Sequence, residues 1–279
     1  MDWILFDPKG PVGAKELHII ATAAWLMLIV VVPVIVLTLV FAWRYRASSQ
    51  TARYTPEWDR SVPIALVCVT IPIAIVATLG VIAWRESHEL DPYRPLDGGA
   101  NGELAKPMEV QVVALDWKWL FVYPQLGVAT VNELAFPAGT PVHFSITATS
   151  VMNAFFIPQL GSMVYAMPRM QTQLSLLADT EGTYAGLSAN YSGAGFSDMK
   201  FAARALSRTA FAEWVDSVRR SDTRLDAVAL GGLLKPEVGA VAHYSAVDGD
   251  VFGQLLMAEA QRPGTSLASA AQVCTTRGN

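Results

Sequence analysis

Two apolar stretches decide the fold class of this chain: LHIIATAAWLMLIVVVPVIVLTLVFAW (residues 17–43) and SVPIALVCVTIPIAIVATLGVIAW (residues 61–84). Each exceeds the roughly 20 residues that an α-helix needs to cross about 30 Å of hydrocarbon. Trp43 and Trp84 end the two stretches, as aromatic residues at a membrane interface commonly do. Since nothing else in the chain is large enough to bury both as soluble helices, the sequence predicts two transmembrane spans.

The composition supports a membrane protein. Charged residues make up 16% of the 279 residues, against about 25% in soluble domains, and the mean hydropathy is +0.34. The net charge of −4, with no basic stripe, argues against a nucleic-acid partner. Cys68 lies in an apolar run and Cys274 in the tail, so no disulfide is expected.

The charges around the two stretches predict their orientation. The link between them carries the arginines, whereas acids dominate the segment after the second stretch. By the positive-inside rule the link is cytoplasmic, and both termini lie outside, which is the periplasm in a Gram-negative bacterium. The charged residues of the link are Arg44, Arg46, Arg53, Glu57, Asp59 and Arg60.

The sequence period changes after the second span. Residues 109–115, 128–136, 142–149 and 171–177 alternate or are rich in β-branched residues, with turn signals between them, which predicts a β-sandwich or Greek-key barrel. An amphipathic helix is expected over residues 208–220 and a second helical piece over residues 248–261. The predicted organisation is an outside segment (1–16), a helix hairpin (17–96), a β-domain (106–207), a helical extension (208–262) and a disordered tail (263–279).

Several segments together resemble subunit II of the haem-copper respiratory oxidases, and specifically of the bo-type ubiquinol oxidases. The resemblance is dense over residues 7–203 and implies a cupredoxin-like Greek-key β-sandwich on the outer face of the bacterial inner membrane. The segments that carry it are DPKG (7–10), FAWRYRAS (41–48), MEVQVVALDWKW (108–119), ATVNELAFP (129–137), SVMNAFFIPQLGS (150–162) and GLSANYSGAGFSDM (186–199).

The resemblance also identifies the positions at which copper-containing relatives bind metal. Those relatives use thiolates, imidazoles and a thioether, the soft ligands that a dinuclear copper centre requires. Serine, asparagine and phenylalanine cannot replace them, and Met199 alone does not hold copper, so we predict that none of these positions binds metal. The six positions are occupied by Asn153, Ser188, Asn190, Ser192, Phe196 and Met199.

The remaining polar candidates do not form a site in the sequence. The four histidines, His18, His88, His143 and His243, have no ligand spacing between them. Relatives of this kind often have a glutamate for proton entry early in the second span, where this chain has Ala65; Asp59 and Glu57 are the nearby alternatives.

Two further features bear on the resemblance. Residues 1–6 contain no cysteine to carry the lipid of some relatives, so either the chain lacks that anchor or the precursor begins elsewhere. Trp117 and Trp119 are expected on a strand, packed at the domain surface or against a neighbouring subunit.

The resemblance therefore implies a chain with no catalytic residue and no cofactor of its own. The haems and one copper are expected on the main partner, subunit I, with subunits III and IV and membrane lipid as further partners, and cytochrome c is not expected to bind. Two alternatives stay open: an electron-entry subunit of a cytochrome c oxidase, and a stand-alone membrane-tethered cupredoxin-like binding module.

Overall fold

The computed structural model describes residues 6–46, 61–96 and 107–258. The chain divides into two units, Lys15–Asp91 and a second unit made of Met1–Ala14 and Pro92–Asn279. Four predictions fall on residues outside the described ranges. They concern the acids Glu57 and Asp59, the arginines Arg53 and Arg60, the position of Cys274, and the disordered tail from residue 263.

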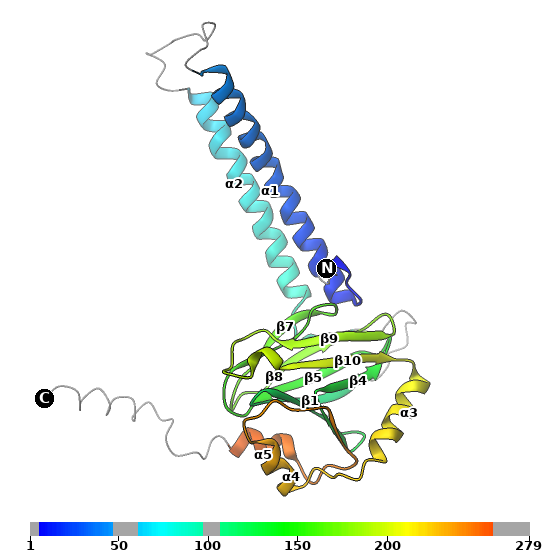
Figure 1. Cartoon of the computed structure of the whole chain (residues 1–279). Coiled ribbons are helices and arrows are strands. Elements are labelled where there is room, and N and C mark those ends of the chain that lie inside the picture. The colour runs from blue at the N-terminus through cyan, green and yellow to red at the C-terminus, as the bar shows by residue number, and fades with distance from the viewer. Residues whose placement is uncertain (1–5, 47–60, 97–106, 259–279) are drawn as a thin grey trace, which may run out of the picture. The chain divides into compact units, whose positions relative to one another are not determined.

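The first unit consists of two long helices, α1 (Pro11–Arg44) and α2 (Val62–Glu89), labelled in Figure 1. Both are long and apolar enough to cross a bilayer. The hydroxyls of Thr22 and Thr38 donate to carbonyl oxygens one turn back, at 2.8 and 2.7 Å, which explains how polar residues fit an apolar span. The first helix begins six residues before the predicted span, because Pro11 suits the first position of a helix. Its first turn belongs to the second unit.

The second unit is built on two facing β-sheets (Figure 1). One sheet has the strand order β11-β3-β2-β1-β5-β8 and the other the order β4-β10-β9-β6-β7. Strands β1 and β5 run parallel, as do β4 and β10, and the other pairs are antiparallel. The strands are β1 (Met108–Leu115), β2 (Lys118–Tyr123), β3 (Val128–Val131), β4 (Glu133–Pro137), β5 (Val142–Ala148), β6 (Asn153–Ile157), β7 (Gly161–Ala166), β8 (Thr172–Leu176), β9 (Gly182–Ser188), β10 (Lys200–Leu206) and β11 (Ala242–Tyr244).

Aromatic rings fill the space between the sheets. Phe155 and Phe201 stack at 5.2 Å between ring centroids, and Trp119 meets both rings edge-on. Trp119 is fully buried. The prediction of a surface tryptophan is therefore wrong at this position, because the alternation of β2 turns its side chain toward the core.

Asn132 takes the chain from one sheet to the other. It lies between β3 and β4 with a positive φ of 56°, a conformation that asparagine tolerates better than most residues. Its side-chain oxygen accepts from the Trp119 backbone nitrogen at 2.8 Å, and its amide donates to the Gly239 carbonyl at 2.6 Å. These hydrogen bonds fix the corner between the sheets to Trp119 on one side and to Gly239 on the other. Glu133 directly follows Asn132.

Most of the C-terminal extension, residues 208–258, covers the outer face of the first sheet, whereas its Trp214, Val215 and Val218 belong to the core cluster between the sheets. Outward side chains of that sheet, such as Leu120 and Val131, form a second apolar cluster with Leu225, Tyr244 and Phe252 of the extension. The extension contains α3 (Arg208–Arg219), α4 (Ala227–Leu233), β11 and α5 (Val251–Ala258). The sequence predicted a helical extension. The extension also contains a strand, because β11 pairs with the sheet edge at β3.

The segment before α1 binds the sandwich through its backbone. Lys9 donates to the Gln159 carbonyl, and its own carbonyl accepts from Asp179, both at 2.8 Å. A side chain on Gly10 would lie 2.2 Å from the Leu177 carbonyl oxygen, so this close approach requires glycine. The DPKG segment of the sequence therefore has a structural role.

Candidate functional site

The six positions that the resemblance singles out gather at one end of the sandwich. Asn153 is the first residue of β6, Ser188 the last of β9, and Met199 directly precedes β10. The loop between β9 and β10 brings Ser192 and Phe196 to the same end, with a short 3-10 helix at Phe196–Asp198. The backbone of Ser188 donates to the Met199 carbonyl at 3.1 Å, which closes the loop at its base.

Asn153 and Ser188 hydrogen-bond to each other. The Ser188 hydroxyl donates to the Asn153 side-chain oxygen at 3.1 Å, and the Ala154 backbone nitrogen lies 3.4 Å from the same hydroxyl. The Asn153 amide in turn donates to the Val151 carbonyl at 3.1 Å. Both side chains are buried. These two neutral groups thus satisfy each other by hydrogen bonding.

Ser192 and Met199 form the second pair. The Ser192 hydroxyl lies 3.8 Å from the Met199 sulfur, a weak donor–acceptor contact, and Met199 is buried. The Ser192 carbonyl accepts from the indole nitrogen of Trp117 at 3.1 Å. Trp117 lies in the turn between β1 and β2 with a positive φ of 67°, so the prediction that it belongs to a strand is wrong.

Glycine lets the loop pack on Trp117. A side chain on Gly195 would come within 2.5 Å of the Trp117 ring. Gly193 has a φ of 112° and also borders this ring. The Trp117 ring therefore fixes the shape of the loop from the side of the β1–β2 turn.

Asn190 and Phe196 lie at the rim, apart from the two buried pairs. The Asn190 amide donates to the Met152 carbonyl at 3.0 Å, and the ring of Phe196 meets that of Tyr191 edge-on at 5.7 Å. Tyr191 is 75% exposed, and Val151 and Met152 nearby are exposed too. Val151, Met152 and Tyr191 thus give the rim an exposed apolar part.

The arrangement supplies hydroxyls, amides and one thioether, but no thiolate or imidazole. Hydrogen bonds already use the polar atoms of Asn153 and Ser188. Within the described ranges, no group of three or more histidine, cysteine, aspartate or glutamate side chains could hold a metal ion. The inability of these positions to bind copper stays a prediction, and its physical reason is the hardness and neutrality of the donors.

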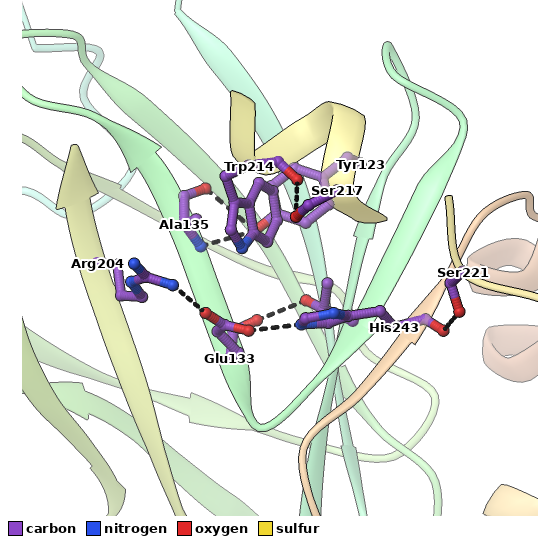
Figure 2. Close-up of polar contacts among 9 residues, drawn as sticks. Tyr123, Glu133, Ala135, Arg204, Trp214, Ser217, Ser221 and His243 are labelled. Carbon is purple, nitrogen blue, oxygen red and sulfur yellow. Dashed lines mark hydrogen bonds and ion pairs between the residues drawn. The ribbon is translucent and has the colours of Figure 1, made fainter. Parts of the chain in front are cut away.

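A second polar cluster, drawn in Figure 2, was missed by the sequence analysis. The Glu133 carboxylate contacts Arg204 Nη1 at 2.8 Å and His243 Nε2 at 2.5 Å. Burial alone would raise the pKa of Glu133, but the hydrogen bonds and charges of Arg204 and His243 outweigh it, so the pKa lies below its ordinary value. Since Glu133 and His243 are 110 residues apart, no local pattern could have paired them.

A buried lysine lies beneath the same extension. The Lys118 side chain is 2% exposed, and its ammonium is 3.9 Å from the carboxylate of Glu237. Burial lowers the pKa of Lys118, while Glu237 and Asp116 act in the opposite direction. His143, by contrast, lies on β5 and contacts the Ser175 hydroxyl at 3.2 Å.

Two helices that are long and apolar enough to cross a membrane, followed by a β-sandwich, fit the class of oxidase subunit II. Consistent with this, the family described as cytochrome c oxidase subunit II, periplasmic domain, matches residues 120–206. The chain is 48% identical over 283 residues to cytochrome bo(3) ubiquinol oxidase subunit 2 of Pseudomonas putida, covering 99% of this chain and 88% of that protein.

Two further relatives agree. The subunit of the same name from Pseudomonas aeruginosa is 51% identical over 256 residues, covering 91% of this chain and 76% of the relative. Ubiquinol oxidase subunit 2 of Acetobacter aceti is 50% identical over 252 residues, covering 90% and 81%. The chain therefore belongs to the ubiquinol oxidase subunit II family of the haem-copper oxidases. The predicted family and cupredoxin-like fold are confirmed.

Proposed function

We propose that this chain is the non-catalytic subunit II of a proton-pumping terminal ubiquinol oxidase in the inner membrane of a bacterium. Such a complex oxidises quinol and reduces O₂ to water. The haems and one copper belong to subunit I in this proposal, with subunits III and IV as further neighbours. The termini and the β-sandwich lie on the periplasmic side.

The observation that carries the proposal is the hydrogen bond between Asn153 and Ser188 at 3.1 Å. In a chain so similar to ubiquinol oxidase subunits, the side chains at two of the six positions hydrogen-bond to each other. A relay of electrons through this domain would lack its acceptor, so electrons reach the large subunit by another route. The alternative of an electron-entry subunit has no comparable support.

The role left to the chain is structural. The two helices would pack on subunit I, and the sandwich would cover its outer face, excluding water and ordering the loops there. The apolar rim at Val151, Met152 and Tyr191 is consistent with a covered surface.

Substrate choice tests the oxidase assignment. The complex is purified through a tag on this chain, and oxygen uptake is measured with a short-chain ubiquinol and with reduced cytochrome c. We expect uptake with the quinol and none above background with cytochrome c. Turnover driven by cytochrome c would overturn the proposal.

Removal of the exported domain tests the structural role. A chain ending before residue 106 is expressed with the partner subunits, and haem content and oxygen uptake are compared with those of the full chain. We expect loss of assembled, haem-containing complex. Unchanged assembly and turnover would reject the covering role while leaving the oxidase assignment standing.

A further inference from the structure

The segment that joins α4 to β11, residues 235–241, lies over the first residue of β2, and we call it the strap. Every residue of the strap except Gly239 is exposed, and the strap itself contains neither helix nor strand. Backbone pairing therefore does not hold it against the sandwich, as it holds β11. The contacts of a few single residues have to do so.

Gly239 is the point at which the strap meets the sandwich. A side chain on Gly239 would lie 2.9 Å from both Cβ and Cδ of Lys118, so only glycine lets the backbone lie directly on the lysine stem. The Gly239 carbonyl accepts from the side-chain amide of Asn132 at 2.6 Å. The strap is therefore fixed by its backbone at this one residue and covers Lys118 there.

Lys118 is buried beneath the strap. Leu120 and Val122, two and four residues further along β2, belong to the apolar cluster under the extension. Because side chains alternate along a strand, Lys118 points to the same face as these two residues. Its side chain is only 2% exposed, and a lysine is rarely buried to this degree unless it is paired with an opposite charge.

The strap supplies that opposite charge through Glu237. The Glu237 carboxylate lies 3.9 Å from the Lys118 ammonium, which is longer than a hydrogen bond, so the two attract each other as charges. Asp116 also favours the charged form of Lys118, but it lies in the turn before β2 and is not part of the strap. The Glu237 side chain is 70% exposed, so dissolved ions can screen its charge.

The other charged contact of the extension is more sheltered. His243 of β11 contacts Glu133, whose side chain is 10% exposed, and β11 also pairs with β3. Apolar packing holds the rest of the extension, through residues such as Leu225 and Phe252. Screening by salt should therefore act first on the strap, while β11 and the apolar cluster stay in place.

We propose that the strap is a salt-sensitive cover over Lys118, closed by the attraction between Glu237 and the buried ammonium and opened when salt screens that attraction. Opening exposes the lysine at the surface of the extension and leaves the two sheets unchanged. The device concerns the extension and not the oxidase reaction. It makes this part of the exported domain respond to the ionic strength of the solution around it.

Acylation of lysine side chains in the full chain in detergent tests the cover. The chain reacts briefly with N-hydroxysuccinimidyl acetate, and mass spectrometry of its peptides gives the rate at each lysine. The salt concentrations are about 0.1 M and about 1 M sodium chloride, between which the Debye length falls from about 10 Å to about 3 Å. Lys200, an exposed residue of β10, corrects for any effect of salt on the reagent.

The wild type should acylate Lys118 more slowly than Lys200 at the lower salt concentration. The ratio of the two rates should rise about two- to five-fold at the higher concentration, the range that corresponds to a partly exposed ion pair. A Lys118 that reacts as fast as Lys200 in low salt would show that the strap is no cover. A ratio that does not change with salt would show that charge does not close it.

Two glutamate variants assign the response to Glu237. Glu237→Gln keeps the size of the side chain and removes its charge, so Lys118 should already react faster in low salt and the salt response should disappear. Glu213→Gln makes the same change at an exposed position of α3 and should behave as the wild type. A salt response that persists in Glu237→Gln would overturn the proposal.

A third variant tests the cover without changing any charge. Gly239→Ala places a methyl group against the Lys118 stem, so the strap can no longer lie on it. Acylation of Lys118 should then be faster than in the wild type at both salt concentrations. An unchanged rate in this variant would contradict the cover, whatever the glutamate variants show.

Discussion

The two polar regions of the exported domain differ in what holds them. At the loop end, Asn153, Ser188 and Ser192 are neutral, and they pair through hydrogen bonds or a contact with a thioether. At the extension end, Glu133 is an ion held between Arg204 and His243. The first region holds the six positions that the resemblance singled out and has no charge among these three side chains. The second region has concentrated charge in a place that the resemblance did not indicate. The position of a residue in a shared fold therefore says less about its chemistry than its side chain does.

The largest expected effect lies at the extension end. Trp214→Ala removes a buried ring that packs on Tyr123 and His243, and truncation of a buried tryptophan costs about 3–5 kcal/mol. We expect faster amide exchange throughout residues 208–258 and little change in β1 and β5. Trp117→Ala at the loop end is the comparison. Loss of the half-buried Trp117 ring should lower the stability by less. An equal loss of exchange protection in the extension would contradict the separation of the two regions.

Gly195→Ala is expected to have the next largest effect, at the loop end. The new methyl group would lie 2.5 Å from the Trp117 ring, and overpacking of this kind costs about 1–3 kcal/mol. Thermal unfolding of the full chain in detergent measures the change. Gly231→Ala in α4 is the matched control, because nothing lies within 4 Å of its added carbon. A control that destabilises as much as Gly195→Ala would show that the Trp117 contact is not the cause.

Acid titration separates the two regions in another way. The pKa of Glu133 is lower in the folded protein than in the unfolded chain. The stability that Glu133 contributes is therefore present above the unfolded pKa, about 4.3, and is lost as the pH falls through the lower folded value. Exchange protection of β11 should decline over this acid range in the wild type. In Glu133→Gln the decline should be absent, whereas Glu109→Gln, an exposed position on β1, should behave as the wild type.

The smallest effect is expected at the hydrogen-bonded pair of Asn153 and Ser188. Ser188→Ala leaves the Asn153 oxygen and the Ala154 nitrogen without this partner, which costs about 1 kcal/mol. Oxygen uptake of the assembled complex with ubiquinol should stay unchanged, since the hydroxyl takes no part in electron transfer. A large loss of turnover with intact assembly would show that this position has a role beyond packing.

The sequence predicted the parts of the fold that local pattern determines. The two spans follow from uninterrupted apolar runs, and strands β1, β5 and β8 follow from alternation. The amphipathic pattern of residues 208–220 likewise predicted α3. Strand β11 was missed, because three residues give too little pattern and its place depends on pairing with β3.

The candidate site divides in the same way. The six positions were singled out by the resemblance, yet the pairing of Asn153 with Ser188 needed the structure, since the two are 35 residues apart. The burial of Trp119 depends on which face of β2 meets the second sheet. The cluster of Glu133, Arg204 and His243 is assembled from β4, β10 and β11. In the sequence, His243 is only an isolated histidine.

Copper analysis of the purified full chain tests the central claim most directly. The chain is produced with copper supplied, separated from its partner subunits, and assayed for bound metal and for thiolate-to-copper absorption. Our account predicts no stoichiometric copper on this polypeptide and no such absorption. Two copper ions per chain, held by the exported domain and reducible, would contradict it.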